Sequence, residues 1–295
     1  MTRAARVTAV IVLAVGAQAL AAAACTFGLD VESLSGGCVG CLDATSDQTA
    51  RDSSAADGGA DASSDSAVDA ARADAACPTG RGTMIAVPLE RGTQCVDRTE
   101  VTNAQYLEFL EAGAPNAAGS SCADAGLVPQ SGWPYGPGQQ SEPVASVTWC
   151  GAQAFCLWAG KSLCGVAGGG ALDVTRMGDP KVDVWYAVCS HDGKSAYPYG
   201  DAYAPKSCNG GDNVPLGAAN VGSFPACTID PTHDGPFDLS GNVWEWIDAC
   251  GADGRCAARG GGFNSPADEL RCNYAPLYSA RDAAAVTIGF RCCSP

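Results

Sequence analysis

The chain has 295 residues and a formal net charge of −15, and it contains 17 cysteines but only two histidines. An acidic surface of this strength repels phosphate backbones, so nucleic acid is excluded as an expected partner. So many free thiols are unusual in a reducing cytosol, and we therefore expect a disulfide framework in an oxidising compartment.

Residues 1–24 have the pattern of a secretion signal. Two arginines precede a nearly unbroken apolar run at 7–20, and four alanines then form a small-residue cleavage zone. Cys25 follows these alanines directly, as in a bacterial lipoprotein signal, although Ala22 stands where such signals usually have Leu. The alternative is ordinary cleavage that leaves Cys25 unmodified. Without the two arginines the net charge changes from −15 to about −17.

Residues 25–76 are predicted to form a disordered tether. From 42 to 76 the chain is nearly all Ala, Asp, Ser and Gly and has no aromatic residue, so it cannot bury enough apolar surface to offset the entropy of ordering. Cys38 and Cys41 precede this stretch, and we expect them to pair with each other. With Cys25 lipidated, the tether would attach the rest of the chain to a membrane.

The folded domain is predicted to span 77–295. It holds 14 cysteines, enough for seven disulfides, together with all six Trp and all eight Tyr residues. A zinc protein is the alternative explanation of the cysteines. However, the single Cys-x-x-Cys lies at 38–41, and no second ligand pair stands at a matching distance.

Three helices are predicted in this domain. The first begins with a capping box at 102–105 and ends at Gly113. The second covers 149–159, with Thr148 as its N-cap, and a third, shorter helix ends near 185–189. Their apolar residues recur at helical spacing.

Short strands are predicted at 84–89, 259–263 and 287–292. Gly, Pro and Asn are frequent throughout, which favours many turns and irregular loops over long regular elements. Few helices with scattered short strands indicate an α+β, loop-rich, disulfide-stapled domain.

Seven local motifs follow one another in the domain, and their order is more specific than any one of them. They are DRTEVTN (97–103), PVASVTW continuing as AFCLWAGK (143–161), YPYGD (197–201), VGSFP (221–225), GNVWEW (241–246), RGGGF (259–263) and IGFR (288–291). In this order, over about residues 80–293, they resemble the formylglycine-generating enzyme (sulfatase-modifying factor) family.

The resemblance implies a variant of the C-type lectin fold, with two helices, little regular strand and much loop. It also implies structural calcium, whose expected ligands here are Asp238, the carbonyls of Gly241 and Val243, and Glu245. Calcium takes six to eight hard oxygens, which a glycine-rich turn with flanking carboxylates can supply. The alternative is that the two Trp residues of the turn anchor the core and Glu245 accepts backbone hydrogen bonds.

A second calcium site of the family would correspond to Asn209 and Gly210. Its acidic partner is not evident from the sequence, and Asp212 is the nearest candidate.

The resemblance also implies a catalytic position. Family enzymes oxidise a substrate cysteine to formylglycine with copper and oxygen, and two cysteines after the Arg-Gly-Gly-Ser-Phe segment bind copper(I), a soft ion that suits thiolates. Here Ser265 occupies the first position, and Cys272 matches the second only after a two-residue shift. A hydroxyl is a poor copper(I) ligand, and Cys272 is expected to be a disulfide partner. We therefore expect no copper site.

Other chemistries have weaker support. His191 and His233 are too few and too isolated for a catalytic triad or a metal site. The glycine runs at 168–170 and 260–262 lack the Gly-x-x-x-x-Gly-Lys pattern of phosphate loops. The family members that assist iron-dependent sulfoxide synthases take their iron ligands from a separate domain that bears histidines, which is not found in this sequence.

Two functions remain open. The first is an envelope-attached or secreted, monomeric binding module for a protein, peptide or glycan, in which the oxidase chemistry is lost. The second is an oxidoreductase of the formylglycine-generating type that acts on a cysteine through an altered site.

Overall fold

The computed structural model describes residues 77–294, apart from 116–117, 215 and 231–234. The described residues belong to the compact unit 61–295. The predicted signal (1–24), Cys25, the tether with Cys38 and Cys41, and His233 lie outside them. Among the described residues, no helix combines the length and hydrophobicity that a membrane span requires.

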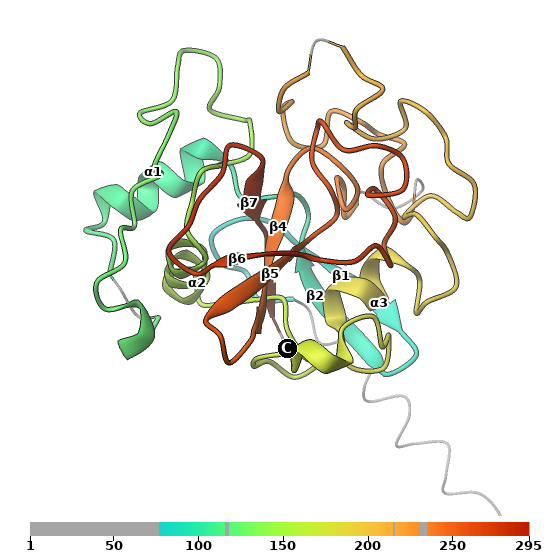
Figure 1. The fold of residues 1–295 in the computed structure, drawn as a ribbon, viewed down its shortest axis with the longest axis horizontal. Coiled ribbons are helices and arrows are strands. Elements are labelled where there is room, and N and C mark those ends of the chain that lie inside the picture. Colours follow the sequence, from blue (N-terminus) through green and yellow to red (C-terminus); the bar gives the residue numbers. More distant parts are fainter. Residues whose placement is uncertain (1–76, 116–117, 215, 231–234, 295) are drawn as a thin grey trace, which may run out of the picture. The chain divides into compact units, whose positions relative to one another are not determined.

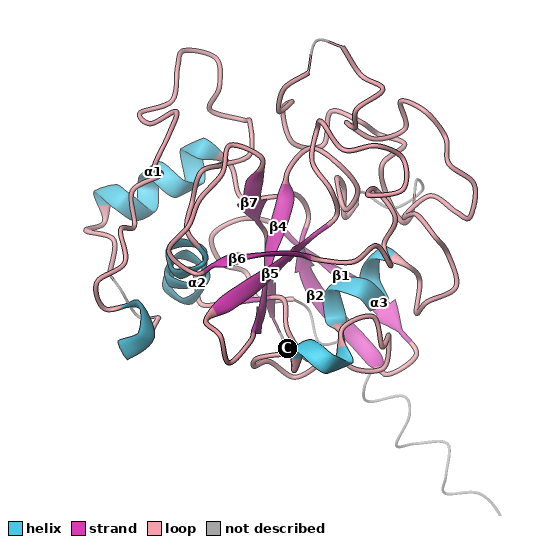
Figure 2. Ribbon diagram, in the orientation of Figure 1, coloured by secondary structure: helices cyan, strands magenta, loops and turns pink. Residues whose placement is uncertain are grey.

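The three predicted helices are present, and their caps follow the sequence (Figures 1 and 2). Helix α1 (Asn103–Glu111) has the predicted capping box: Thr102 Oγ1 accepts from Gln105 N at 3.3 Å, and Gln105 Oε1 accepts from Thr102 N at 2.9 Å. Helix α2 (Trp149–Trp158) is capped by Thr148, whose hydroxyl accepts from Gly151 N at 2.9 Å. Helix α3 (Val184–Cys189) is buried along its whole length. Two 3-10 turns, Ser120–Cys122 and Val174–Arg176, complete the helical structure of the described residues.

One sheet joins the start of the domain to its last strand. Its strand order is β1 (Met84–Leu89), β2 (Gly92–Asp97), β8 (Cys292–Ser294) and β3 (Ser162–Leu163), and all neighbours are antiparallel. The strand predicted at 84–89 is confirmed as β1. Because β8 lies between β2 and β3, residues about two hundred positions apart in sequence share this sheet.

The second sheet has the order β6 (Leu277–Ala280), β5 (Arg255–Arg259), β4 (Trp244–Cys250) and β7 (Ile288–Phe290), with β7 parallel to β4. The predicted strand at 259–263 is wrong. Strand β5 ends at Arg259, because Gly260 and Gly261 take positive φ values of 94° and 74° and turn the chain. The strand predicted at 287–292 is divided into β7 and β8.

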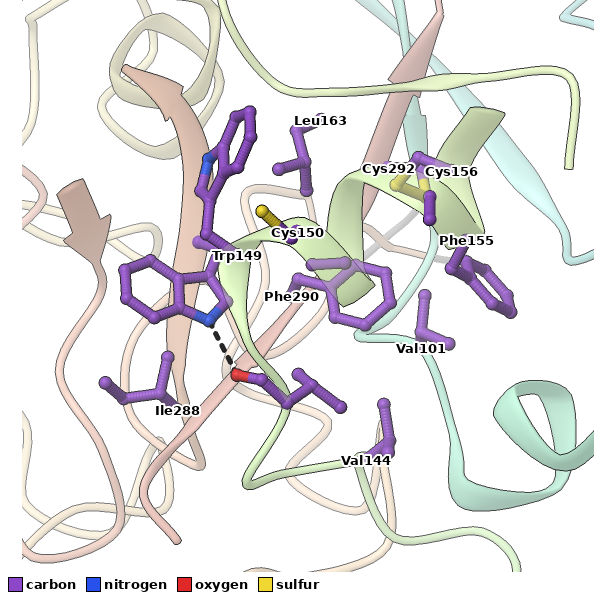
Figure 3. Close-up of a cluster of buried hydrophobic side chains, with 14 of the residues drawn as sticks. Val101, Val144, Trp149, Cys150, Phe155, Cys156, Leu163, Ile288, Phe290 and Cys292 are labelled. Carbon is purple, nitrogen blue, oxygen red and sulfur yellow. Dashed lines mark hydrogen bonds between the residues drawn. A yellow bond between two sulfur atoms is a disulfide. The ribbon is translucent and has the colours of Figure 1, made fainter. Parts of the chain in front are cut away.

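In the part of the chain that the structure describes, the core consists of two clusters of buried side chains. The first packs α1 and α2 against strands β4 and β7, with Phe155 and Phe290 in edge contact at 5.4 Å between ring centroids. In Figure 3 these two rings lie beside Val101, Val144 and the Cys156–Cys292 disulfide. The second cluster is centred on α3, with Trp185 and Ile247 fully buried.

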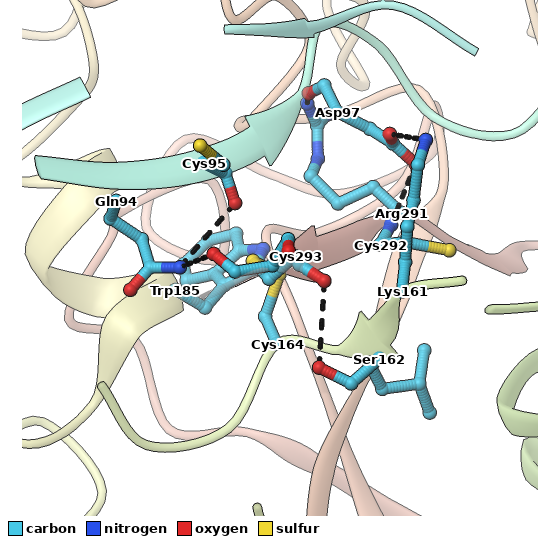
Figure 4. The surroundings of a disulfide bond; sticks show 12 residues. Gln94, Cys95, Asp97, Lys161, Ser162, Cys164, Trp185, Arg291, Cys292 and Cys293 are labelled. Atoms are coloured by element: carbon cyan, nitrogen blue, oxygen red, sulfur yellow. Dashed lines mark hydrogen bonds and ion pairs between the residues drawn. A yellow bond between two sulfur atoms is a disulfide. The ribbon is translucent and has the colours of Figure 1, made fainter. Parts of the chain in front are cut away.

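All fourteen cysteines of the described residues form disulfides, as the sequence predicts. The pairs are Cys77–Cys95, Cys122–Cys150, Cys156–Cys292, Cys164–Cys293, Cys189–Cys272, Cys208–Cys227 and Cys250–Cys256. Cys292 fastens β8 to α2 through Cys156 (Figure 3). The adjacent Cys293 fastens β8 to the segment after β3 through Cys164 (Figure 4). The domain is therefore α+β, loop-rich and disulfide-stapled, and its many disulfides indicate an oxidising compartment.

Candidate functional site

The first of the two positions expected to bind copper holds a hydroxyl that is already hydrogen-bonded. Ser265 is only 2% exposed. Its Oγ donates to Glu269 Oε2 at 2.7 Å and accepts from Gly262 N at 3.1 Å. These bonds close the turn that follows the glycine run, so Ser265 has a structural role in this loop.

The second copper position is also occupied by a bonded group. Cys272 is 1% exposed and forms a disulfide with Cys189 of α3, with an S–S distance of 2.01 Å. A disulfide sulfur carries no thiolate charge. The residues at these two positions therefore do not fit copper(I), which prefers two thiolates.

The carboxylate of Glu245 is surrounded by N–H donors. Arg291 Nε donates to both carboxylate oxygens at 2.8 Å, and Arg291 Nη2 donates to Oε1 at 2.6 Å. Trp185 Nε1 donates to Oε2 at 2.7 Å. All three side chains are at least 99% buried. Because both oxygens face donor hydrogens and a guanidinium charge, Glu245 in this arrangement does not fit as a calcium ligand.

Asp238 lies close to this ion pair. Its φ is +60°, and its Oδ2 accepts from Gly222 N at 2.5 Å. Burial and, to a smaller extent, the Glu245 charge raise the pKa of Asp238 to about 6, although the Gly222 hydrogen bond and the Arg291 charge act against them. Asp238 therefore has a backbone donor at one oxygen and titrates close to neutral pH.

Glu100, which no sequence signal marked as a site residue, belongs to the same buried group. It accepts from Asn242 Nδ2 at 3.2 Å and from Val243 N at 3.4 Å. Burial raises the pKa of Glu100 well above its usual value, and the Asp238 charge acts in the same direction. Three carboxyl groups (Glu100, Asp238 and Glu245) thus surround one guanidinium, that of Arg291, and we call them the carboxyl cluster.

The residues of the second predicted calcium site lie against the glycine turn. Asn209 O accepts from Asn242 N at 2.7 Å, and a Cβ added to Gly241 would lie 2.3 Å from that same oxygen. Only glycine fits here. Gly210 packs against Leu270 of the Ser265 loop. Asp212 is not part of this arrangement, since its carboxylate accepts from Tyr203 Oη at 2.7 Å.

The glycine turn and its neighbours are therefore held together by hydrogen bonds within the protein. Among the described residues, no three His, Cys, Asp or Glu side chains are grouped so that they could hold a metal ion. His191 is apart from the carboxyl cluster, and its Nε2 is 3.0 Å from the carbonyl oxygen of Pro198, to which it donates.

A cavity of about 340 Å³ opens beside the carboxyl cluster. It is lined by polar groups of the DRTEVTN segment, by the first turn of α1 and by two loops; the residues are Gly82, Thr83, Asp97, Arg98, Thr99, Glu100, Gln105, Val221, Gly222 and Phe237. Asp97 is paired with Lys161 at 2.5 Å, and its Oδ2 accepts from Cys292 N at 2.9 Å (Figure 4). The sequence marked this segment only as a family motif, and nothing in the motif indicated a cavity.

Comparison with known proteins identifies the family. The family profile described as "Sulfatase-modifying factor enzyme 1-like domain" matches residues 89–294. The chain is 30% identical over 184 residues to the "Inactive C-alpha-formylglycine-generating enzyme 2" of Bos taurus, covering 55% of this chain and 54% of that protein. It is 27% identical to the "Formylglycine-generating enzyme" of Thermomonospora curvata (51% of this chain, 58% of that protein). It is 29% identical to the "Hercynine oxygenase" of Mycolicibacterium thermoresistibile, in an alignment that covers 51% of this chain and 34% of that protein.

The solved structures that align with the chain include "PvdO from Pseudomonas aeruginosa", with a TM-score of 0.49 at 17% identity, covering 72% of this chain and 91% of that one. "Treponema denticola variable protein 1" aligns with a TM-score of 0.45 at 18% identity, covering 69% and 84%. The chain spans about half the length of the first curated relatives. The family profile matches most of the described domain, and this domain is α+β with few helices. Both findings confirm the predicted fold, the family's variant of the C-type lectin fold. This chain belongs to the family of sulfatase-modifying factor enzyme 1-like domains.

Proposed function

We propose that the domain is a binding module of this family that has lost the copper-dependent oxidase chemistry and works outside the cytoplasm. The observation that carries the proposal is the state of the two copper positions. Ser265 is hydrogen-bonded to Glu269, and Cys272 is bonded to Cys189. A protein of this fold that lacks the thiolate pair keeps its surfaces but has no means to bind copper(I).

The ligand class follows from the cavity beside the carboxyl cluster. Carboxyl, hydroxyl and amide groups of Asp97, Thr99 and Gln105 line it, and Phe237 contributes one aromatic ring. Such a lining favours a polar group that both donates and accepts hydrogen bonds, as the backbone of a peptide or the hydroxyls of a glycan do. The proposed ligand is therefore a polar segment of a protein, peptide or glycan. The module itself is a monomer.

The proposed location is the bacterial cell envelope. The disulfide framework supports export, and the signal-like residues 1–24 followed by Cys25 support attachment through a lipid. A periplasmic or secreted protein is the alternative if Cys25 is not modified.

The test is a copper(I) titration combined with an activity assay. The purified protein, copper-loaded under air, is incubated with a Cys-x-Pro-x-Arg peptide, and mass spectrometry follows the mass loss of the thiol-to-aldehyde change. We expect neither copper(I) binding nor turnover. Turnover by the unmodified protein would overturn the proposal and favour an oxidase with an altered site.

A matched variant shows that the assay can detect a restored site. Cys189→Ser frees Cys272 from its disulfide, and Ser265→Cys adds a thiol at the first position. The double variant Ser265→Cys/Cys189→Ser therefore carries thiols at the two positions that the resemblance assigns to copper(I). We expect it to gain copper(I) binding, whereas the control Ser265→Ala/Cys189→Ser does not.

A further inference from the structure

The seven disulfides differ in how well solvent reaches them. Twelve of the fourteen described cysteines are buried, and the two that are only half-buried are Cys77 and Cys250. Thiol–disulfide exchange requires a thiolate to approach one sulfur of the bond directly, so access limits which bonds can react. Five disulfides have both cysteines buried and are therefore protected while the domain is folded.

Cys250 and Cys256 lie opposite each other at the end of a hairpin. Cys250 is the last residue of β4, and its backbone partner on β5 is Cys256. A register shift separates this pair from the preceding pair at Trp246, so the disulfide joins only the outer part of the hairpin. The tip has exposed residues at Ala252, Asp253 and Arg255.

Opening this disulfide leaves the hairpin closed by other bonds. Gly251 N donates to Arg255 O at 2.8 Å, and Gly254 N donates to Gly251 O at 3.0 Å. On its other side β5 remains paired with β6. The two cysteines are only six positions apart, against 83 to 136 for the three widest described disulfides. Of the seven disulfides in the described residues, this bond therefore constrains the unfolded chain least. The folded domain can therefore exist with this bond either closed or open.

We propose that Cys250–Cys256 is a thiol–disulfide exchange site that reacts with a dithiol partner while the rest of the domain stays folded. The attacking thiolate forms a bond to Cys250 Sγ, because Cys256 is fully buried and its sulfur is shielded. The sulfur–sulfur bond breaks, and Cys256 leaves as a thiolate and takes up a proton. The second thiolate of the partner then attacks its own sulfur in the mixed disulfide and releases Cys250 as a thiol. In total, the partner dithiol is oxidised to a disulfide and this chain gains two thiols.

The first experiment titrates the full-length protein with dithiothreitol under native conditions. Alkylation before and after complete reduction, followed by peptide mass spectrometry, reports each pair separately. We expect Cys250 and Cys256 to be labelled at a dithiol concentration about tenfold or more below that needed by the five fully buried disulfides. Near-ultraviolet circular dichroism should keep its folded signal at that point. A Cys250–Cys256 bond that stays closed until the protein unfolds would overturn the proposal.

Two matched variants test the direction of attack. Cys256→Ser leaves Cys250 as a half-exposed thiol, which should form a mixed disulfide with added oxidised glutathione. Cys250→Ser leaves only the buried Cys256, which should react at least about tenfold more slowly. Equal rates in the two variants would contradict the assignment of Cys250 as the attacked sulfur. If a variant fails to fold, the titration of the unmodified protein still decides the proposal. The half-buried Cys77–Cys95 serves as the comparison for accessibility: opening of that bond with Cys250–Cys256 still closed would overturn the proposal.

Discussion

The carboxyl cluster predicts that this domain becomes more stable on mild acidification. The pKa of Asp238 is about 6 in the folded state, above the ordinary aspartate value of 3.8 that we take for the unfolded chain. Between these values the folded chain holds a proton that the unfolded chain has released, so the free energy of unfolding falls as pH rises through this window. The difference of about two pKa units corresponds to about 3 kcal/mol, present below pH 4 and lost above pH 6.

Other groups of the fold reinforce this direction. Burial also raises the pKa of Glu100, Asp97 and Asp248, so each contributes stability at low pH. The pKa values of Glu90 and Asp179 are lowered by hydrogen bonds from Lys194 and Arg176, which acts in the opposite sense. The Glu90 side chain is exposed and the Asp179 side chain is partly exposed, and ion pairs in contact with solvent contribute little to stability. The buried groups should therefore dominate the pH dependence of the free energy of unfolding.

The perturbation that isolates the effect is Asp238→Asn. Asparagine tolerates the left-handed backbone at this position, and its carbonyl can still accept from Gly222 N. We expect the variant to be about 1–3 kcal/mol more stable than the parent at pH 7.5 and equal to it near pH 4. The control is Asp268→Asn, since the Asp268 side chain is 85% exposed.

The assay is urea denaturation of the parent and both variants at several pH values from 4 to 8, with a chelator in every buffer. A parent whose free energy of unfolding is flat or rises from pH 5 to 7.5 would refute the reasoning. An Asp238→Asn variant with the same pH slope as the parent would refute it equally.

Three more predictions can be checked on the same protein. Arg291→Met should lower the free energy of unfolding, measured by urea denaturation, by about 3–5 kcal/mol, because it leaves the buried Glu245 without its cationic partner. A decrease of less than about 1 kcal/mol would contradict a stabilising role for this ion pair. The double variant Cys156→Ala/Cys292→Ala should lower the free energy of unfolding by about 5 kcal/mol, because this disulfide closes a separation of 136 residues. The double variant Cys250→Ala/Cys256→Ala should lower it by about 2 kcal/mol, because its disulfide closes a separation of only 6. A lower melting temperature for the second variant than for the first would contradict this prediction. Removal of divalent cations should leave the melting temperature unchanged, because Arg291 and Trp185 donate to both Glu245 oxygens. A fall of several degrees would instead support the calcium site that the family resemblance implies.

The helices could be predicted because their signals are local. The capping box at Thr102 and the N-cap at Thr148 lie within a few residues of the helices that they start. The strands were harder to predict from the sequence. Residues 244–249 of β4 are all buried, so the strand shows no alternation of polar and apolar residues, and β3 is only two residues long.

The sequence pointed to only part of the candidate site, and it gave neither Glu100 nor the cavity. The GNVWEW motif contains Glu245, and the family resemblance added Asp238 and the copper position Ser265. The role of Arg291 depends on a contact across 46 residues of sequence, which no local pattern encodes. Disulfide connectivity is of the same kind, since fourteen cysteines allow very many pairings.

The position of β8 has a consequence for how the domain assembles. Residues 292–294 form an inner strand of a sheet whose first hairpin ends at Asp97, and Cys292 and Cys293 are bonded to α2 and to the segment after β3. A chain that emerges from its amino end can form the β1–β2 hairpin early, but it cannot complete the sheet until nearly two hundred further residues have followed. Maturation therefore depends on late oxidation, and Cys156 and Cys164 must remain unpaired, or be reshuffled from other partners, until the final strand arrives.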